Sequence, residues 1–200
     1  MDRQVSGPSR KPIIMTWQGS ASPRLESVRL LVSDGRLRAS GRVVAAANAG
    51  APAFSASFEF SVDRAGDVGR GLLRTTTADE ERQVSVGRTE DGVWLIDHGQ
   101  GAARDEFDGA ADVDVAGLVT FTALPIRRLG LHRKAATHEL PVLYVSMPDL
   151  SVRLVHQTYR TVSVDEAGAV INYTVPDFTA DLTVDTDGLV IDYPGIARRV

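Results

Sequence analysis

Two adjacent arginines, Arg127 and Arg128, are the side chains whose type and position most suggest anion binding. They follow Leu124-Pro125-Ile126 and precede Leu129, so the pair lies inside an apolar segment. We interpret the segment as a β-strand, in which neighbouring side chains point to opposite faces of a sheet. One guanidinium should then be mostly buried and the other exposed, and a buried cation is costly without an anionic partner. The pair therefore predicts an internal ion pair, an anion-binding site, or both.

The acidic segment just upstream offers the internal partner. Its carboxylates are Asp105, Glu106, Asp108, Asp112 and Asp114. Asp112 and Asp114 should share one strand face, so we expect one of them to contact the buried arginine. The other partner is an anionic or sugar ligand, because the planar guanidinium donates paired hydrogen bonds. His132-Arg133-Lys134 extends the basic cluster over 127–134, either as a cationic lip that favours anionic head groups or as a solvated loop.

Aromatic side chains are the second kind of candidate. Trp94 alternates with Val93 and Leu95, so its indole either fills the core or lines a cavity. Tyr144 is one of several further rings that can stack on sugars or lipid chains, although rings in β proteins more often belong to the core. The others are Trp17, Tyr159, Tyr173 and Tyr193.

The longest predicted strand covers residues 151–164, and one of its faces is our candidate ligand side. Arg153, Val155, Gln157 and Tyr159 share that face. Gln157 and Tyr159 can hydrogen-bond a polar head group. If a cavity exists, we expect its wall to come from this strand and its mouth to carry the basic cluster at 127–134.

The sequence contains no recognisable catalytic or metal-binding motif. The four histidines show neither His-x-His nor His-Glu-x-x-His spacing, which predicts no metal site. The Gly99-Gln100-Gly101 segment lacks the third glycine and the following helix of a phosphate loop, and no Gly-x-Ser-x-Gly elbow occurs. The absence of cysteine excludes thiol catalysis and disulfides. We predict no catalytic residues, no cofactor and no enzymatic activity.

Turn signals and period-two patterning define the elements that must position these side chains. The turns are Asp34-Gly35, Ala65-Gly66, Asp91-Gly92, Ala167-Gly168 and Asp187-Gly188. Such dipeptides between alternating apolar residues are typical of β-hairpins. The fold class is therefore mainly β: a single-domain curved antiparallel sheet, a β-roll or open barrel, with many short strands and one or two short helices.

The boundaries of this domain and its helices follow from the same patterns. Residues 1–12 are predicted to be a disordered tail and 13–200 a single domain. The short helix candidates are 102–107 and 134–139. The final strand should end at Pro194-Gly195, with Leu189, Ile191 and Tyr193 on its core face.

Composition restricts the partners. The net charge of −4 and the pI near 5.6 argue against nucleic acid, which favours basic proteins. The longest uncharged run, 43–58, is too short and too polar to span a bilayer. The absence of cysteine and of an apolar run in the first twelve residues predicts a cytoplasmic protein.

Several longer segments resemble the sequence motifs of one family. Residues 118–129 (LVTFTALPIRRL) resemble the TP-x-TN-x-LPIRRL block of the bacterial putative glycolipid-binding family, first described as a domain of unknown function. Residues 144–150 and 157–159 are similar to its W-x-x-x-P-x-L and Q-x-Y words, residues 182–195 to its YPG ending, and Trp17 with Glu26 to its opening. The chain departs from the pattern at Thr122, where the family has Asn, and at Tyr144, where it has Trp. The resemblance implies a curled, roll-like β fold similar to lipoprotein-carrier folds, and glycolipid binding.

We therefore expect a non-enzymatic protein that binds a glycolipid or another anionic amphiphile in a cavity enclosed by the curved sheet. The expected ligand-binding residues are Arg127, Arg128, Gln157, Tyr159, Trp94 and Tyr144. One alternative is a carboxylate-dependent enzyme on sugar or lipid substrates, for which the spatial separation of two carboxylates is decisive. The other is a packed module that binds a protein at an exposed edge strand. The interior of the roll should distinguish these three functions: an open apolar cavity supports the binding protein, a cleft with two facing carboxylates the enzyme, and a filled core the packed module.

Overall fold

The computed structural model describes residues 12–33, 36–48 and 50–200. The predicted tail lies outside the described residues except for Pro12, and so does the predicted turn at Asp34-Gly35. Within the described ranges the chain forms fifteen strands, one α-helix and one short 3-10 helix. In chain order they are β1 (Ile13–Gly19), β2 (Arg24–Ser33), β3 (Arg36–Ala45), β4 (Phe54–Val62), β5 (Val68–Thr76), β6 (Glu81–Arg88), β7 (Trp94–Asp97), β8 (Ala102–Asp105), η1 (Phe107–Gly109), β9 (Asp112–Val115), α1 (Val119–Arg128), β10 (Thr137–Val145), β11 (Val152–Val164), β12 (Gly168–Val175), β13 (Phe178–Asp185), β14 (Val190–Tyr193) and β15 (Ala197–Arg199).

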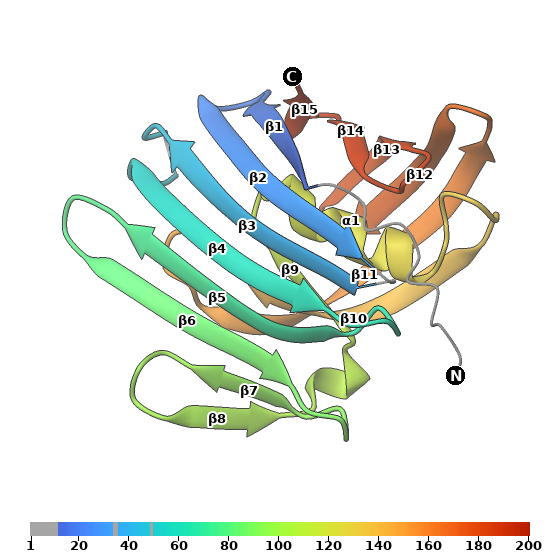
Figure 1. Ribbon diagram of the computed structural model, residues 1–200. Helices are drawn as coiled ribbons and strands as arrows, with labels where there is room; N and C mark the ends of the chain where they lie inside the picture. The colour runs from blue at the N-terminus through green and yellow to red at the C-terminus, as the bar shows by residue number, and fades with distance from the viewer. Residues whose placement is uncertain (1–11, 34–35, 49) are drawn as a thin grey trace, which may run out of the picture.

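All fifteen strands belong to one strongly curved sheet that does not close into a barrel (Figure 1). The strand order is β8-β7-β6-β5-β4-β3-β2-β1-β15-β14-β13-β12-β11-β10-β9. Neighbouring strands are antiparallel except β9 and β10, which run parallel. The prediction of a mainly β protein with a single curved, open sheet is confirmed.

Hairpin turns occur where the sequence predicts them. Ala65-Gly66 joins β4 to β5, Asp91-Gly92 joins β6 to β7, Ala167-Gly168 joins β11 to β12, and Asp187-Gly188 joins β13 to β14. The strand predicted at 151–164 is β11, whose thirteen residues make it the longest described element.

The segment that carries the two arginines is a helix, so its interpretation as a strand is wrong. Residues 119–126 of α1 are all buried, although Pro125 lies inside the helix. A continuous apolar run is compatible with a buried strand and with a buried helix, and periodicity alone does not separate them. Here residues 119–126 are buried on every side of the helix because α1 lies inside the curl of the sheet.

Both helix predictions are also wrong. Ala102–Asp105 is the edge strand β8, paired with β7, and most of 134–139 lies before or at the start of β10. Pairing with a neighbouring strand overrides weak local preference in such short segments. Pro194-Gly195 does end a strand, β14, but this strand is not the last. β15 follows and pairs with both β14 and β1.

The core is formed by the inner face of the sheet and by α1. Phe121 of the helix packs against Phe58 and Phe60 of β4, with ring centroids 5.1 and 4.7 Å apart. Gly41 lies opposite Phe58 in the β3–β4 register, and a Cβ at Gly41 would clash with the Phe58 ring. The inside of the curl next to β2–β5 is therefore filled by the helix and its aromatic contacts.

Candidate functional site

A pocket of about 200 Å³ lies between the start of α1, β9 and β10 on one side and β12–β14 on the other. Its described lining consists of Asp114, Val115, Gly117, Leu118, Thr122, Tyr144, Tyr173, Val175, Phe178, Tyr193 and Ile196. Most of these side chains are apolar or aromatic, and a few are polar. That combination is typical of sites that bind small organic ligands.

Asp114 is the most unusual residue of the pocket. It lies on β9, is 7% exposed, and accepts a 2.8 Å hydrogen bond from the Val115 amide at Oδ1. Its Oδ2 accepts a 2.7 Å hydrogen bond from Nε2 of Gln157 on β11, and Oε1 of Gln157 accepts one of 2.9 Å from the Tyr159 hydroxyl. This series of hydrogen bonds fixes the orientation of the Asp114 carboxyl group.

The surroundings of Asp114 favour its protonated form. Burial raises the pKa of Asp114 to about 6, and the negative charges of Asp112 and Glu26 act in the same direction. The hydrogen bonds from Gln157 and Val115 oppose the shift only in part. A buried carboxyl group with a perturbed pKa at a pocket is a recognised mark of a functional site.

Tyrosines and a phenylalanine form the opposite wall. The Tyr173 ring contacts Tyr159, Tyr193 and Phe178 at centroid distances of 5.2, 5.9 and 6.3 Å, all in tilted or edge-to-face arrangements. Burial raises the pKa of Tyr173 and of Tyr193, so both hydroxyls stay protonated at neutral pH and can donate hydrogen bonds. Tyr144, on the β10 side, carries the Arg153 guanidinium 4.7 Å from its ring centroid.

The buried carboxylate of Glu26 holds the start of α1 beside the pocket. It accepts hydrogen bonds from the amides of Val119 at 2.7 Å and Thr120 at 3.1 Å, and from the Thr120 hydroxyl at 2.5 Å. These amides would otherwise be unsatisfied at a helix N-terminus, where negative charge is also favourable. Burial raises the pKa of Glu26, whereas these hydrogen bonds lower it.

The loop before the helix depends on a glycine. Gly117 has a positive φ of 70° and lines the pocket, and a Cβ there would clash with the Arg24 guanidinium. Any other residue would push Arg24 away from this wall.

The two arginines lie at the other end of α1. Arg128 forms an ion pair with Asp112, with Nη2 2.5 Å from Oδ2, which confirms the prediction that Asp112 or Asp114 is its partner. Arg127 donates a hydrogen bond to the backbone carbonyl of Asp187. Both arginines are partly buried, so the predicted contrast between one hidden and one exposed guanidinium is wrong. On a helix, neighbouring residues do not point to opposite faces.

The basic cluster at 127–134 does not surround the Asp114 pocket. Both arginines line a different pocket of about 160 Å³ with Arg64 and Gly66. His132 is 5% exposed, and burial lowers its pKa, so its imidazole is neutral at physiological pH. The prediction that the 127–134 cluster lies at the opening of the binding site is therefore wrong for this pocket.

Trp94 also lies outside the pocket lining. Its indole is fully buried, and Nε1 donates a 2.8 Å hydrogen bond to the Ala110 carbonyl. Of the predicted ligand residues, the structure brings Tyr144, Gln157 and Tyr159 together around Asp114. It does not bring Trp94, Arg127 or Arg128 there.

Sequence reasoning missed Asp114 as a ligand residue, although it named Asp114 as a partner for arginine. The usable signal was the pair of buried-strand carboxylates at 112 and 114, only one of which can pair with one arginine. Thr122 and Tyr144, the two departures from the words quoted above, both line the pocket. Among the described residues, no group of three or more His, Asp or Glu side chains is placed to hold a metal ion.

The geometry defines a class: an open, curled β-sheet around one helix, with a carboxyl-bearing aromatic pocket beside the start of that helix. The model of the family described as "Putative glycolipid-binding" matches residues 14–199, and the chain belongs to this family. A crystal structure of a DUF1089 family protein from Pseudomonas aeruginosa is similar over 100% of both chains, with 25% sequence identity and a TM-score of 0.74. No curated protein matches the sequence.

Proposed function

We propose that the protein is a non-enzymatic binding protein for a glycolipid or related sugar-bearing amphiphile, and that one sugar ring occupies the Asp114 pocket. The observation that supports this most is a buried, oriented carboxyl group facing tyrosine rings in a pocket of about 200 Å³. The family description points to the same ligand class.

The size of the pocket favours a head group over a lipid chain. Pockets for drug-sized ligands have volumes of about 300–1,000 Å³, so this one accommodates a ring-sized group. Val175, Phe178 and Ile196 are partly exposed apolar residues of the lining, and they offer a path along which an alkyl chain leaves the pocket.

The chemistry of the lining fits a sugar. A carboxylate accepts hydrogen bonds from two neighbouring hydroxyls, and tyrosine hydroxyls can both donate and accept. Aromatic rings cover the apolar C–H face of a sugar at small conformational cost. Asp114 is the one carboxylate in the described lining, whereas glycoside hydrolysis uses a pair of them across the bond. This arrangement favours binding over hydrolysis.

Isothermal titration calorimetry with octyl glycosides of several sugars, kept below their micelle concentrations, tests the proposal. Octyl glycerol ether serves as the chain-matched control without a sugar. We expect saturable binding of at least one glycoside and little binding of the ether. Affinity should rise between about pH 5 and pH 7.5, because the Asp114 carboxylate forms over this range and is the better acceptor.

Asp114→Asn is the matching variant because it keeps the shape of the side chain. We expect it to weaken glycoside binding at least about tenfold and to remove the pH dependence. Asp79→Asn, at an exposed turn, is the charge-matched control and should bind like the wild type. Equal binding by both variants, or no saturable glycoside, would contradict the proposal. Release of free sugar during incubation, followed by NMR, would show an enzyme instead.

A further inference from the structure

The outer face of the sheet carries a regular array of arginines. In the antiparallel register, the outward positions of β2–β6 form rows across the strands. One row reads Leu31, Arg38, Ser61, Arg70, Gly87, and another reads Ser27, Arg42, Ser57, Arg74, Gln83. Between them runs Arg29, Ser40, Glu59, Leu72, Ser85. We call these outward positions of β2–β6 the arginine face.

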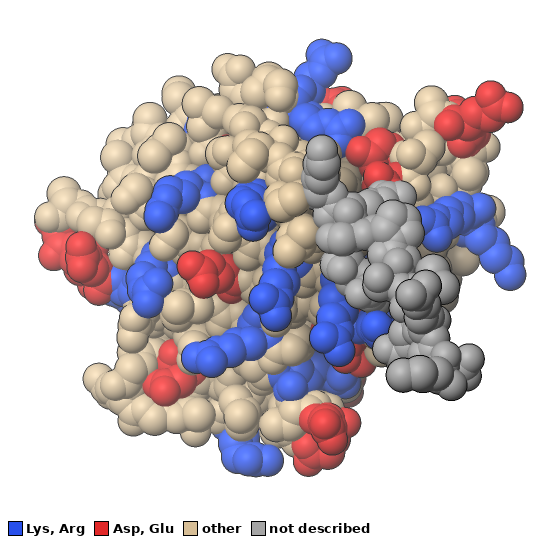
Figure 2. All heavy atoms as spheres, in the orientation of Figure 1, with Lys and Arg blue, Asp and Glu red and all other residues tan. Residues whose placement is uncertain are grey.

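This face is positively charged although the chain as a whole is acidic. It carries Arg29, Arg36, Arg38, Arg42, Arg70 and Arg74 against Glu59 and Glu81, while the net charge of the chain is −4. All six arginines are exposed, and among the described residues none of them has a carboxylate within ion-pair distance. Figure 2 shows Lys and Arg side chains spread over this side of the molecule with few acidic ones among them.

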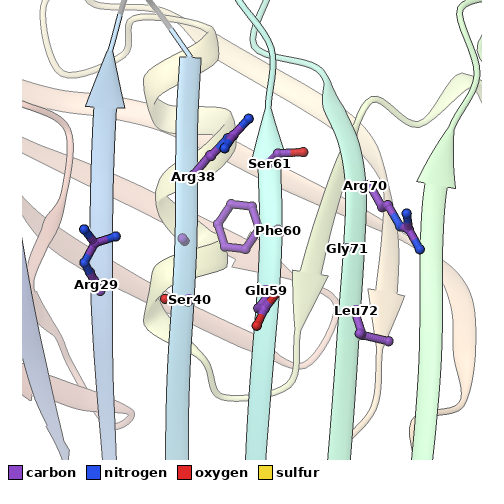
Figure 3. Close-up of a pocket in the computed structure, with 10 residues that line it drawn as sticks. Arg29, Arg38, Ser40, Glu59, Phe60, Ser61, Arg70, Gly71 and Leu72 are labelled. Carbon is purple, nitrogen blue, oxygen red and sulfur yellow. The ribbon is translucent and has the colours of Figure 1, made fainter. Parts of the chain in front are cut away.

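Small residues on β4 turn the array into a groove. Arg38 and Arg70 flank Ser61, and Arg42 and Arg74 flank Ser57. β3 and β5 are about 9.6 Å apart, because each of the two strand spacings between them is about 4.8 Å. Two hollows of about 530 Å³ each follow, one at each arginine pair. Figure 3 shows the first, with Arg29, Arg38 and Arg70 around Ser40, Glu59 and Ser61.

One end of the arginine face is aliphatic. Leu25 and Val44 lie directly opposite each other on β2 and β3 and are 46% and 57% exposed. The 46–53 segment that follows β3 contains no charged residue. Exposed aliphatic side chains next to these arginines form a combined apolar and cationic surface, which is what an interfacial contact with anionic lipid requires.

We propose that the arginine face docks on the surface of an anionic phospholipid bilayer, with phosphate groups in the two arginine–serine hollows and Leu25 and Val44 at the acyl boundary. Each hollow is lined by three arginines, by serine hydroxyls and by one glutamate, Glu59 or Glu81, so the donors suited to a phosphate outnumber the carboxylate. The six arginines spread in two dimensions over a broad face, which matches a surface more closely than a strand. The described outward positions of β2–β6 include no aromatic ring on which a nucleic-acid base could stack.

Vesicle co-sedimentation tests the proposal without any glycolipid, so the result does not depend on the pocket. We expect the protein to bind vesicles that contain phosphatidylglycerol much more tightly than pure phosphatidylcholine vesicles, and binding should weaken with salt. Each arginine near such a surface contributes about fivefold to affinity. Replacing Arg38, Arg42, Arg70 and Arg74 with Gln should therefore weaken binding at least about a hundredfold.

The matched control replaces four exposed cationic residues outside this face, Arg133, Lys134, Arg153 and Arg160, with Gln. It changes the net charge equally and should retain most of the binding, as should Asp114→Asn. Leu25→Ser with Val44→Ser should remove most of the binding that survives at high salt. The proposal is overturned if both arginine sets weaken binding equally, if phosphatidylcholine vesicles bind as tightly, or if duplex DNA displaces the protein from vesicles at low concentration. Thermal unfolding of each variant verifies that it is folded.

Discussion

The guanidinium of Arg128 contacts both carboxylate oxygens of Asp112, with Nη2 2.5 Å from Oδ2 and Nε 3.2 Å from Oδ1. The contact joins the last turn of α1 to the edge strand β9. Arg128 is 19% exposed at its side chain and Asp112 only 1%. The pair therefore fixes the end of the helix inside the curl. It also compensates the charge of a buried carboxylate that lies two residues before Asp114 on the same strand.

Arg128→Ala should destabilise the fold by about 3–5 kcal/mol near neutral pH, because it leaves a buried carboxylate without its partner. Burial raises the pKa of Asp112 and Arg128 opposes that effect, so the variant should take up a proton on Asp112 more readily. The loss should therefore shrink as the pH falls. Urea unfolding at several pH values measures it, and the double variant Arg128→Ala with Asp112→Asn should recover part of the stability. An equal loss at all pH values would contradict this account.

Asp114 should make the protein more stable in mild acid. Its folded-state pKa of about 6 lies above the ordinary value of 3.8, so the folded state binds the proton more tightly than the unfolded state. The contribution is fully present below about pH 4 and is lost as the pH rises through about 6, an effect on the order of 3 kcal/mol. Unfolding free energies of the wild type and Asp114→Asn should differ in slope over this range. Parallel curves would show that Asp114 is already charged in the folded protein.

Two threonines two residues apart on α1, which therefore point to different sides of the helix, should separate stability from binding. Thr120→Val removes the hydroxyl that donates to Glu26 and should cost about 1.5–3 kcal/mol, as expected for a hydrogen bond to a charged group. Thr122→Val alters the pocket lining and should change stability by less than about 1 kcal/mol while weakening glycoside binding. Thermal unfolding and calorimetric titration of both variants distinguish these roles. Weakened glycoside binding by Thr120→Val, at a temperature where it is folded, would argue against the separation.

Removal of residues 189–200 should abolish the cooperative unfolding transition. This segment contains β14 and β15, which link β13 to β1 and so join the two halves of the sheet. Val190 also accepts a 2.9 Å hydrogen bond from the buried Trp17 indole. Circular dichroism during heating measures the transition. A truncated chain that still unfolds sharply would show that β14 and β15 are peripheral.

No helix among the described residues is long and apolar enough to cross a membrane. α1 has ten residues, about half of what a span requires, and it is covered by the sheet.

The sequence alone determined the class of fold and much of its strand layout. Period-two patterning and Asp-Gly or Ala-Gly turns are local properties, and they predicted hairpins at 65–66, 91–92, 167–168 and 187–188 and the long strand β11. The sequence also predicted that a carboxylate at 112 or 114 would pair with an arginine. A buried cation requires an anionic partner whether its backbone is a strand or a helix.

Only the tertiary structure decided the nature of residues 119–128 and the place of the site. An apolar run of this length is equally compatible with strand and helix, and the choice depends on the space inside a sheet built from the whole chain. Asp114, Gln157 and Tyr193 converge because β9, β11 and β14 curl toward each other, and sequence patterns contain no information on that distance. The first residues of α1 lie at the pocket and the arginine pair lies at its opposite end, which is why Arg127 and Arg128 do not belong to the site.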